Sequence, residues 1–335
     1  MIALARTARV STMSRVEPRV TIVVVPRERF SESKRSLESV YEHTQMPFKL
    51  VYVDGRSPRK IRLYLEESAP KRGFQHVRLN RYLSPNEARN IGLRHVDTEY
   101  VVFLDNDLIA SPGWLDRLVE CADETGAWLV GPLYLEGDPK DEIIHMAGGD
   151  IEFDGEPGKR TFTTDHRFQG TAVADLPEPL KREPCDFIEF HCMLARSDVF
   201  EKLGPLDEKL MSTREHLDLC LKTREAGGEV YFEPTSVVTY STPPPLAVSD
   251  IPFFMVRWSE AWGRTSLERF VEKYELDPSY ADRVRIMTGR RQIVFRPIRR
   301  AVRKIAGGTA DYYAGEALLR AERTVNRVLV KTPSS

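Results

Sequence analysis

The nine residues from Glu99 to Asp107, EYVVFLDND, constrain the fold of this chain more than any other segment. Residues 100–104 are all apolar or aromatic, which is typical of a strand buried on both faces. Asp105 and Asp107 follow where such a strand would leave its sheet. Ligands of open α/β sheets bind at this carboxyl edge, and carboxylate oxygens suit Mg²⁺ or Mn²⁺. The competing interpretation is a solvated turn or a helix N-cap before residues 111–113.

Length and charge narrow the class of protein. The chain has 335 residues, enough for one large α/β domain with an accessory region, and its 49 basic residues balance 50 acidic ones. A net charge this close to zero argues against nucleic acid as a partner. No apolar run approaches the ~18 residues of a membrane-spanning helix. The cysteines lack zinc-like spacing and are too few for a disulfide framework, so we expect a cytoplasmic protein. The first 19 residues are rich in arginine and are predicted to be a flexible basic arm.

Apolar strands and amphipathic helices alternate in the first half of the chain. Strands are expected at residues 20–25, 48–53 and 76–79, with helices between them. Ser84, Pro85 and Glu87 carry the signals of an N-cap, a first helical position and a third position, so a helix should begin there. This order predicts a mostly parallel central sheet with helices on both faces.

The second half is less regular. A helix at 114–124 and a strand at 127–130 precede residues 131–184, where paired glycines and a threonine cluster predict turns and short edge strands rather than a second core. A strand at 186–196, a helix at 214–226 and two short strands at 229–232 and 236–240 should follow. Three prolines at 243–245 mark the end of this domain, and the remainder, including 253–274, is predicted to be helical.

Several short motifs stand in an order that resembles the family 2 glycosyltransferases of the GT-A fold. The matching positions are Pro26 after the first strand, Asp54 after the second, the Ala88-Arg89-Asn90-Ile91-Gly92-Leu93 helix, Asp105-Asn106-Asp107, Gly204-Pro205-Leu206-Asp207, and Glu215 with Asp218-Leu219-Cys220. The resemblance covers about residues 20–242. It implies a nucleotide-sugar half at about 20–130 and an acceptor half at about 131–242.

The resemblance also implies a reaction and a set of roles. A sugar would move from a nucleoside diphosphate donor, usually UDP, to an acceptor hydroxyl with inversion, and Mn²⁺ or Mg²⁺ on Asp107 and Asp105 would neutralise the leaving group. The residues expected to bind the donor are Pro26, Asp54, Arg89, Asn90, Asp105 and Asn106. Asp54 would hold the base, Arg89 would reach the diphosphate or brace the Asp-x-Asp loop, and Asn90 would fix that loop. The competing role for Arg89 and Asn90 is helix-surface structure.

Two departures from the family pattern affect the chemistry. Glu215-His216 stands where an acidic pair is common, so we expect Glu215 and His216 jointly to supply the general base, with Asp218 in support. Alternatively, His216 only caps or packs its helix. Tyr240 stands near the position of a frequent metal-ligating histidine, so the metal would be held by one or two aspartates and the diphosphate alone. For His145 and His191 a structural role is favoured over a place at the site.

The segment 283–304 carries nine basic residues and no acid, interleaved with apolar ones. Such a segment suits the inner surface of an anionic membrane, and a lipid-linked glycan is then a candidate acceptor. The alternative is a solvated helical face, with Pro297 interrupting any continuous helix. Two other functions stay open: a nucleotidyltransferase, which would want a glycine-rich loop after the first strand, and a catalytically degenerate binding or scaffold subunit.

Overall fold

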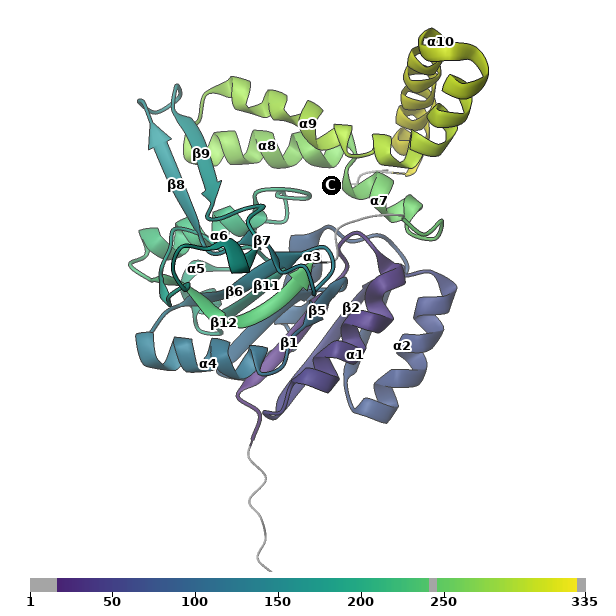
Figure 1. Cartoon of the computed structure of the whole chain (residues 1–335). Helices are drawn as coiled ribbons and strands as arrows, with labels where there is room; N and C mark the ends of the chain where they lie inside the picture. Colours follow the sequence, from purple (N-terminus) through teal and green to yellow (C-terminus); the bar gives the residue numbers. More distant parts are fainter. Residues whose placement is uncertain (1–16, 241–245, 330–335) are drawn as a thin grey trace, which may run out of the picture.

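The computed structural model describes residues 17–240 and 246–329, and ten strands of these residues form one curled, mixed sheet (Figure 1). Its order is β10-β12-β6-β11-β4-β1-β2-β3, with β5 paired to β12 and β7 paired to β6. The strands are Val20–Val25 (β1), Phe48–Gly55 (β2), Gln75–Leu79 (β3), Tyr100–Asp105 (β4), Leu108–Ala110 (β5), Leu129–Glu136 (β6), Ile143–Met146 (β7), Glu183–Pro184 (β10), Cys192–Arg196 (β11) and Val230–Tyr240 (β12). The expected α/β fold class is confirmed, with β4 and β1 near the middle of the sheet.

The central strands run parallel, which places their carboxyl ends together. β1 pairs in parallel with β2 and β4, and β2 pairs in parallel with β3. Val25, the last residue of β1, lies opposite Asp105, the last residue of β4. Both strands are buried along their whole length, as their unbroken apolar sequences predict. β11 runs antiparallel to β4 and β6.

Six helices cover the two faces of the sheet. They are Ser33–His43 (α1), Arg59–Arg72 (α2), Pro85–Leu93 (α3), Trp114–Thr125 (α4), Val199–Leu203 (α5) and Glu215–Glu225 (α6). Helices α1, α2 and α4 lie on one face and α3, α5 and α6 on the other (Figure 1). Helix α3 begins at Pro85 as predicted, although the Ser84 side chain makes no capping hydrogen bond and Glu87 pairs with Arg81 instead.

The segment 131–184 differs in part from its prediction. Short edge strands occur as expected in β7 and β10, but Gly149–Asp154 (β8) and Thr161–His166 (β9) form a separate two-stranded sheet. Phe162 of this hairpin lies against Phe153 and against Phe270, at ring-centroid distances of 4.9 and 5.1 Å. Phe162 and Phe270 belong to the same buried cluster as the strands of the main sheet, so the hairpin adds to that core and, as predicted, does not form a second one.

Two strands also differ in length from their predictions. Instead of the two short strands expected at 229–232 and 236–240, the chain forms one strand, β12. Its pairing with β6 is irregular between Glu233 and Val237, a stretch that contains Pro234. Conversely, β11 spans only Cys192–Arg196, because residues 186–191 run as an irregular segment toward the carboxyl edge.

The C-terminal helices lie above the carboxyl edge of the sheet (Figure 1). They are Ile251–Arg257 (α7), Glu260–Tyr274 (α8), Val284–Gly289 (α9) and Gln292–Leu329 (α10), with a short 3₁₀ segment at Pro278–Arg283. The prolines at 243–245 and residues 1–16 of the basic arm lie outside the described residues. Of the rest of that arm, Arg19 is tied by ion pairs to Glu99 and Asp123.

Helix α10 is a helical hairpin rather than one rod. Pro297 lies inside its first arm, and the helix continues through it, contrary to expectation. The break falls at Gly307, whose φ of 83° is a conformation that glycine adopts without strain. Arg299 pairs with Asp311 across the two arms. None of the helices within the described residues is both long and apolar enough to cross a membrane.

Candidate functional site

Asp105 is fixed by three basic side chains at the end of β4. Its carboxylate lies 2.9 Å from His191 Nδ1, 3.4 Å from Arg89 Nη2 and 3.5 Å from Arg27 Nε. Burial alone would raise the pKa of Asp105, but the charge of Arg27 and the hydrogen bond with His191 hold it below its ordinary value. Asp105 is therefore an ionised anchor whose oxygens are already engaged.

Asp107 lies in the turn after β4 and, unlike Asp105, its carboxylate is not held by hydrogen bonds from the described residues. The side chain is fully buried, and neither carboxylate oxygen has a hydrogen-bond partner among the described residues. The closest ion pair joins Oδ2 to Arg29 Nε at 3.8 Å. Burial and the charge of Asp105 raise the pKa of Asp107 to about 7. A buried carboxylate without a hydrogen bond fits a divalent cation, because a buried charge needs a partner.

Asn106, between the two aspartates, ties this turn to the loop after β1. Its Oδ1 accepts from the Arg27 backbone at 2.7 Å, and its Nδ2 donates to Ser33 Oγ at 2.8 Å. Pro26 is buried between β1 and this loop. The Asp-x-Asp turn and the Arg27 loop consequently form one connected unit.

Arg89 and Asn90, predicted together, act in different places. Arg89 is fully buried, with its guanidinium carbon 3.9 Å from the centroid of the Phe190 ring, and it contacts Asp105. Asn90 instead holds the loop before α6: it donates to the Leu206 carbonyl at 2.9 Å and accepts from the Leu206 amide at 3.0 Å. The expectation that Asn90 fixes the Asp-x-Asp loop is therefore not met.

Asp54 is buried at the end of β2 and its carboxylate is already bonded. It accepts from the Ser57 amide at 2.7 Å, from Ser57 Oγ at 2.9 Å and from Arg78, with His76 Nε2 at 3.3 Å. Burial opposes ionisation, but the hydrogen bonds from His76 and Ser57 hold the pKa of Asp54 below its ordinary value. Any contact with a nucleotide base would have to share these oxygens.

The three residues expected to supply the base separate at the start of α6. Glu215 is buried, with Oε1 3.2 Å from Arg257 Nη2 and 3.8 Å from Arg27 Nη1, while Oε2 lacks a hydrogen-bond partner in the described chain. His216 points elsewhere, with its ring centroid 5.9 Å from that of Phe187. Burial lowers the pKa of His216 to about 4.

Asp218, the third of these residues, faces the C-terminal helices. Its carboxylate accepts from Tyr274 Oη at 2.8 Å and pairs with Lys273. It therefore joins α6 to α8 and does not contact Glu215 or the Asp-x-Asp turn through any hydrogen bond or ion pair found in the described residues.

A cavity of about 550 Å³ opens beside the Asp-x-Asp, between the sheet edge and the C-terminal helices. The sheet side contributes Arg27, Glu28, Glu136, His145, Gln169, Glu189, His191 and Tyr240, and the C-terminal side contributes Phe254, Gly289, Arg290, Gln292, Ile293, Arg296 and Arg299. The wall of the second side is strongly basic. The cavity does not touch Glu215 directly, but Arg27 lies between them.

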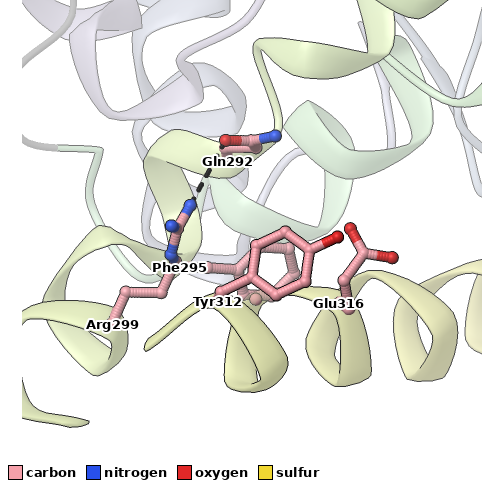
Figure 2. Close-up of a pocket in the computed structure, with 6 residues that line it drawn as sticks. Gln292, Phe295, Arg299, Tyr312 and Glu316 are labelled. Carbon is pink, nitrogen blue, oxygen red and sulfur yellow. Dashed lines mark hydrogen bonds between the residues drawn. The ribbon is translucent and has the colours of Figure 1, made fainter. Parts of the chain in front are cut away.

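A second, smaller cavity of about 240 Å³ lies within the α10 hairpin (Figure 2). Tyr312 and Glu316 of the second arm face Phe295 and Arg299 of the first, and Arg299 Nη1 donates to Gln292 Oε1 at 3.4 Å. This cavity carries no carboxylate pair or histidine, so the larger one is the candidate active site.

Comparison with known proteins agrees with this geometry. The sequence profile described as glycosyl transferase family 2 matches residues 21–204, more than half of the chain. The chain belongs to this family. The match includes the Asp-x-Asp, but it ends before Glu215 and Tyr240, the two positions at which the sequence departs from the family pattern.

Two curated proteins resemble parts of the chain. A pre-mycofactocin glycosyltransferase of Mycobacterium tuberculosis is 26% identical over 156 residues, which are 47% of this chain and 30% of that protein. The O-antigen biosynthesis protein RfbC of Myxococcus xanthus is 25% identical over 223 residues, 63% of this chain and 16% of that protein. The chain thus spans less than a third of the length of either relative.

Among solved structures, the crystal structure of GalNAc-T7 with UDP, GalNAc and Mn²⁺ aligns with a TM-score of 0.53 and 15% sequence identity, covering 78% of this chain and 55% of that one. At this identity the likeness establishes the GT-A fold.

Several residues at the wall of the candidate site were not predicted from the sequence. His145 and His191, expected to be structural, line the cavity, and His166 and Glu189 join them. Their convergence depends on strands β7, β9 and β11, which lie in or next to the segment with the weakest periodicity. The sequence offered one clue: all four histidines after residue 100 fall between residues 145 and 216.

Proposed function

We propose that the protein is an inverting glycosyltransferase that moves a sugar from a nucleoside diphosphate donor, first of all a UDP-sugar, to a hydroxyl group of an acceptor. Membership in family 2 supports sugar transfer. The observation that carries the proposal is Asp107, a buried carboxylate without a hydrogen-bond partner in the described chain, next to an Asp105 that three basic groups hold in place.

Asp107, with Asp105 beside it, would hold a Mn²⁺ or Mg²⁺ ion, which supplies positive charge to the departing diphosphate. The chain's own cations would assist. Arg27 lines the cavity and contacts Asp105, so its guanidinium is placed to meet a diphosphate, whereas the buried Arg89 positions Asp105 from behind. Asp54 and Arg78, at the ends of β2 and β3, would lie toward the base of the nucleotide.

We further propose that Glu215, rather than His216, removes the proton from the acceptor hydroxyl. The charges of Arg257, Arg89 and Arg27 outweigh burial and hold the pKa of Glu215 below its ordinary value, so it is ionised at neutral pH. His216 is not among the residues that line the cavity, and its ring lies 5.9 Å from that of Phe187 instead. Glu215 is separated from the cavity by one side chain, Arg27.

The acceptor we propose carries negative charge and approaches from a membrane surface. Arg290, Arg296 and Arg299 form the basic wall of the cavity, which suits a diphosphate such as that of a lipid-linked glycan. The same segment continues into exposed apolar side chains, with Ile286 and Ile305 at 74% and 87% exposure. Basic and apolar groups together favour adsorption to an anionic membrane.

Calorimetric titration of the full chain with UDP tests the donor site. We expect binding that requires Mn²⁺ and that weakens at least tenfold in Asp107→Asn, with no change in the control Asp97→Asn, whose carboxylate is exposed and pairs with Lys49. Equal binding by Asp107→Asn, or no binding of any nucleoside diphosphate, would overturn the proposal. Binding of UDP-sugars without release of UDP, across varied acceptors, would favour the degenerate binding subunit.

A further inference from the structure

Three imidazoles surround the carboxylate of Glu189 at the cavity wall. Its oxygens lie 3.0 Å from His145 Nε2, 3.3 Å from His166 Nε2 and 3.1 Å from His191 Nε2. These residues come from β7, from the end of β9 and from the segment before β11, three parts of the chain that the fold brings together. Glu189 itself lines the cavity with its side chain 13% exposed, and the charges of His191 and His145 outweigh desolvation and hold its pKa well below the ordinary value.

The spacing of three of these groups fits a metal ion. The ligand atoms of His145, His166 and Glu189 all lie within 4.8 Å of one another. Tetrahedral Zn²⁺, with bonds of about 2.0–2.1 Å, holds its ligand atoms about 3.4 Å apart. The His145–Glu189 and His166–Glu189 separations of 3.0 and 3.3 Å are close to that value. The first distance ends at Oε2 of Glu189 and the second at Oε1, and no two ligand atoms are more than 4.8 Å apart, so the three groups would draw closer together around an ion.

His145 also has a second contact of the kind found around metal centres. Metal-binding histidines usually turn their second ring nitrogen toward a carboxylate or carbonyl, which fixes the ring. His145 does so: Nε2 faces Glu189, and Nδ1 lies 3.3 Å from Glu136 Oε2. On the other side His191 bridges Glu189 to Asp105 and so connects the cluster to the Asp-x-Asp.

We propose that His145, His166 and Glu189 bind one transition-metal ion, Zn²⁺ foremost, at a site separate from Asp107. Two imidazoles and one carboxylate form the ligand set of zinc sites that keep a fourth position open. His145 and Glu189 line the cavity, so that position faces it and would take an oxygen donor, from water or from the acceptor. Asp107, in contrast, offers only oxygen ligands, which suit Mn²⁺ or Mg²⁺. The two sites can therefore be tested independently.

Metal content after chelation and reloading is the direct test. The full chain is stripped with a chelator, equilibrated with Zn²⁺ in slight excess, desalted and analysed by mass spectrometry of the metal. We expect about one zinc per chain, an affinity at least tenfold weaker in His145→Gln and in His166→Gln, and no change in His95→Gln, an exposed histidine outside the cluster. Asp107→Asn should also keep its zinc.

Three results would overturn the proposal: a wild-type chain that retains no zinc, equal retention by His145→Gln and His166→Gln, or loss of zinc in Asp107→Asn. Because a cluster variant could fail to fold, the wild-type protein loaded with Co²⁺ gives a second measurement. Intense visible absorption bands of four-coordinate Co²⁺ would support the site, and the weak bands of six-coordinate Co²⁺ would contradict it. Neither readout depends on transferase activity.

Discussion

The imidazole of His191 stacks on the phenol ring of Tyr240, with ring centroids 4.7 Å apart and planes inclined by 29°. Tyr240 ends β12, near the position where the family often has a metal-binding histidine. In this chain the imidazole next to Tyr240 is that of His191, which comes from the segment before β11 and hydrogen-bonds Asp105. A tyrosine at residue 240 is thus compatible with a histidine at the site.

Replacing His191 separates its stacking from its polar contacts. His191→Phe keeps an aromatic ring against Tyr240 but loses the contacts with Asp105 and Glu189. Since groups that orient metal-binding residues typically contribute 10- to 100-fold, we expect UDP-sugar turnover or Mn²⁺ affinity to fall by about that factor. Steady-state kinetics at varied Mn²⁺ measures this. Tyr240→Phe is the control, and its turnover and Mn²⁺ affinity should stay within a few-fold of wild type. If His191→Phe has wild-type turnover and Mn²⁺ affinity, the polar contacts of His191 do not contribute to either.

Asp107→Asn should stabilise the metal-free protein while removing donor binding. Burial and the neighbouring Asp105 disfavour the charged form of Asp107, and its pKa of about 7 exceeds the value in an unfolded chain. The wild-type carboxylate therefore costs stability that is absent at pH 4 and grows as the pH rises toward 7. Thermal melts in chelator should show a higher Tm for Asp107→Asn at pH 7 and no gain near pH 4. A lower Tm at pH 7 would contradict the account of an unsatisfied buried charge.

Glu215 and His216 make opposite predictions for the pH dependence of turnover. If Glu215 is the base, Glu215→Gln should reduce turnover by roughly 10²- to 10⁴-fold. His216→Gln should leave the shape of the profile between about pH 5.5 and pH 8 unchanged, because burial keeps the pKa of His216 near 4. An acid limb near pH 6.5 that disappears in His216→Gln would reverse this assignment.

His216 should also make the folded protein sensitive to acid. Its imidazole takes up a proton in the unfolded chain below about pH 6.5 but not in the folded state until about pH 4, so stability falls as the pH drops through this interval. Between pH 7 and pH 5 we expect wild type to lose roughly 1–2 kcal/mol more than His216→Gln in denaturant unfolding. Equal losses would show that the imidazole is solvated.

The sequence predicted those parts of the site that depend on strands and on contiguous motifs. The unbroken apolar character of residues 20–25 and 100–104 places Asp105 at the sheet edge, because a strand buried on both faces has few alternatives. It could not predict that Asn90 binds the Leu206 backbone, since this depends on the path of a loop. Nor could it predict the Glu189 cluster, because turn-rich segments carry little information about which strands pair.

The basic segment on α10 should adsorb to anionic vesicles. Arg300, Arg303 and Lys304 are exposed, and each basic group near such a surface contributes about 1 kcal/mol. We therefore expect the triple Gln variant to bind phosphatidylglycerol vesicles about 100-fold more weakly in sedimentation assays. A matched triple Gln variant at three exposed basic residues of the sheet domain, Arg59, Lys60 and Lys140, should bind as wild type does. Equal loss in both variants would indicate an effect of net charge alone.

Gly92, in the Ala-Arg-Asn-x-Gly-Leu motif, lets α3 approach β1. A Cβ atom there would lie 2.2 Å from Val23 Cγ1, inside a strand that is fully buried. Alanine normally stabilises a helix by about 1 kcal/mol relative to glycine. At residue 92 we expect the reverse, a loss of about 1–3 kcal/mol in denaturant unfolding, because a packed core does not accept an added methyl group without displacement. Gly289→Ala, in α9 with open space around its Cβ, is the matched control and should not destabilise. Because α3 also carries Arg89, a displaced α3 should weaken UDP binding in Gly92→Ala as well. A Gly92→Ala variant that is as stable as wild type and binds UDP normally would show that the glycine is not needed for the close approach of α3 to β1.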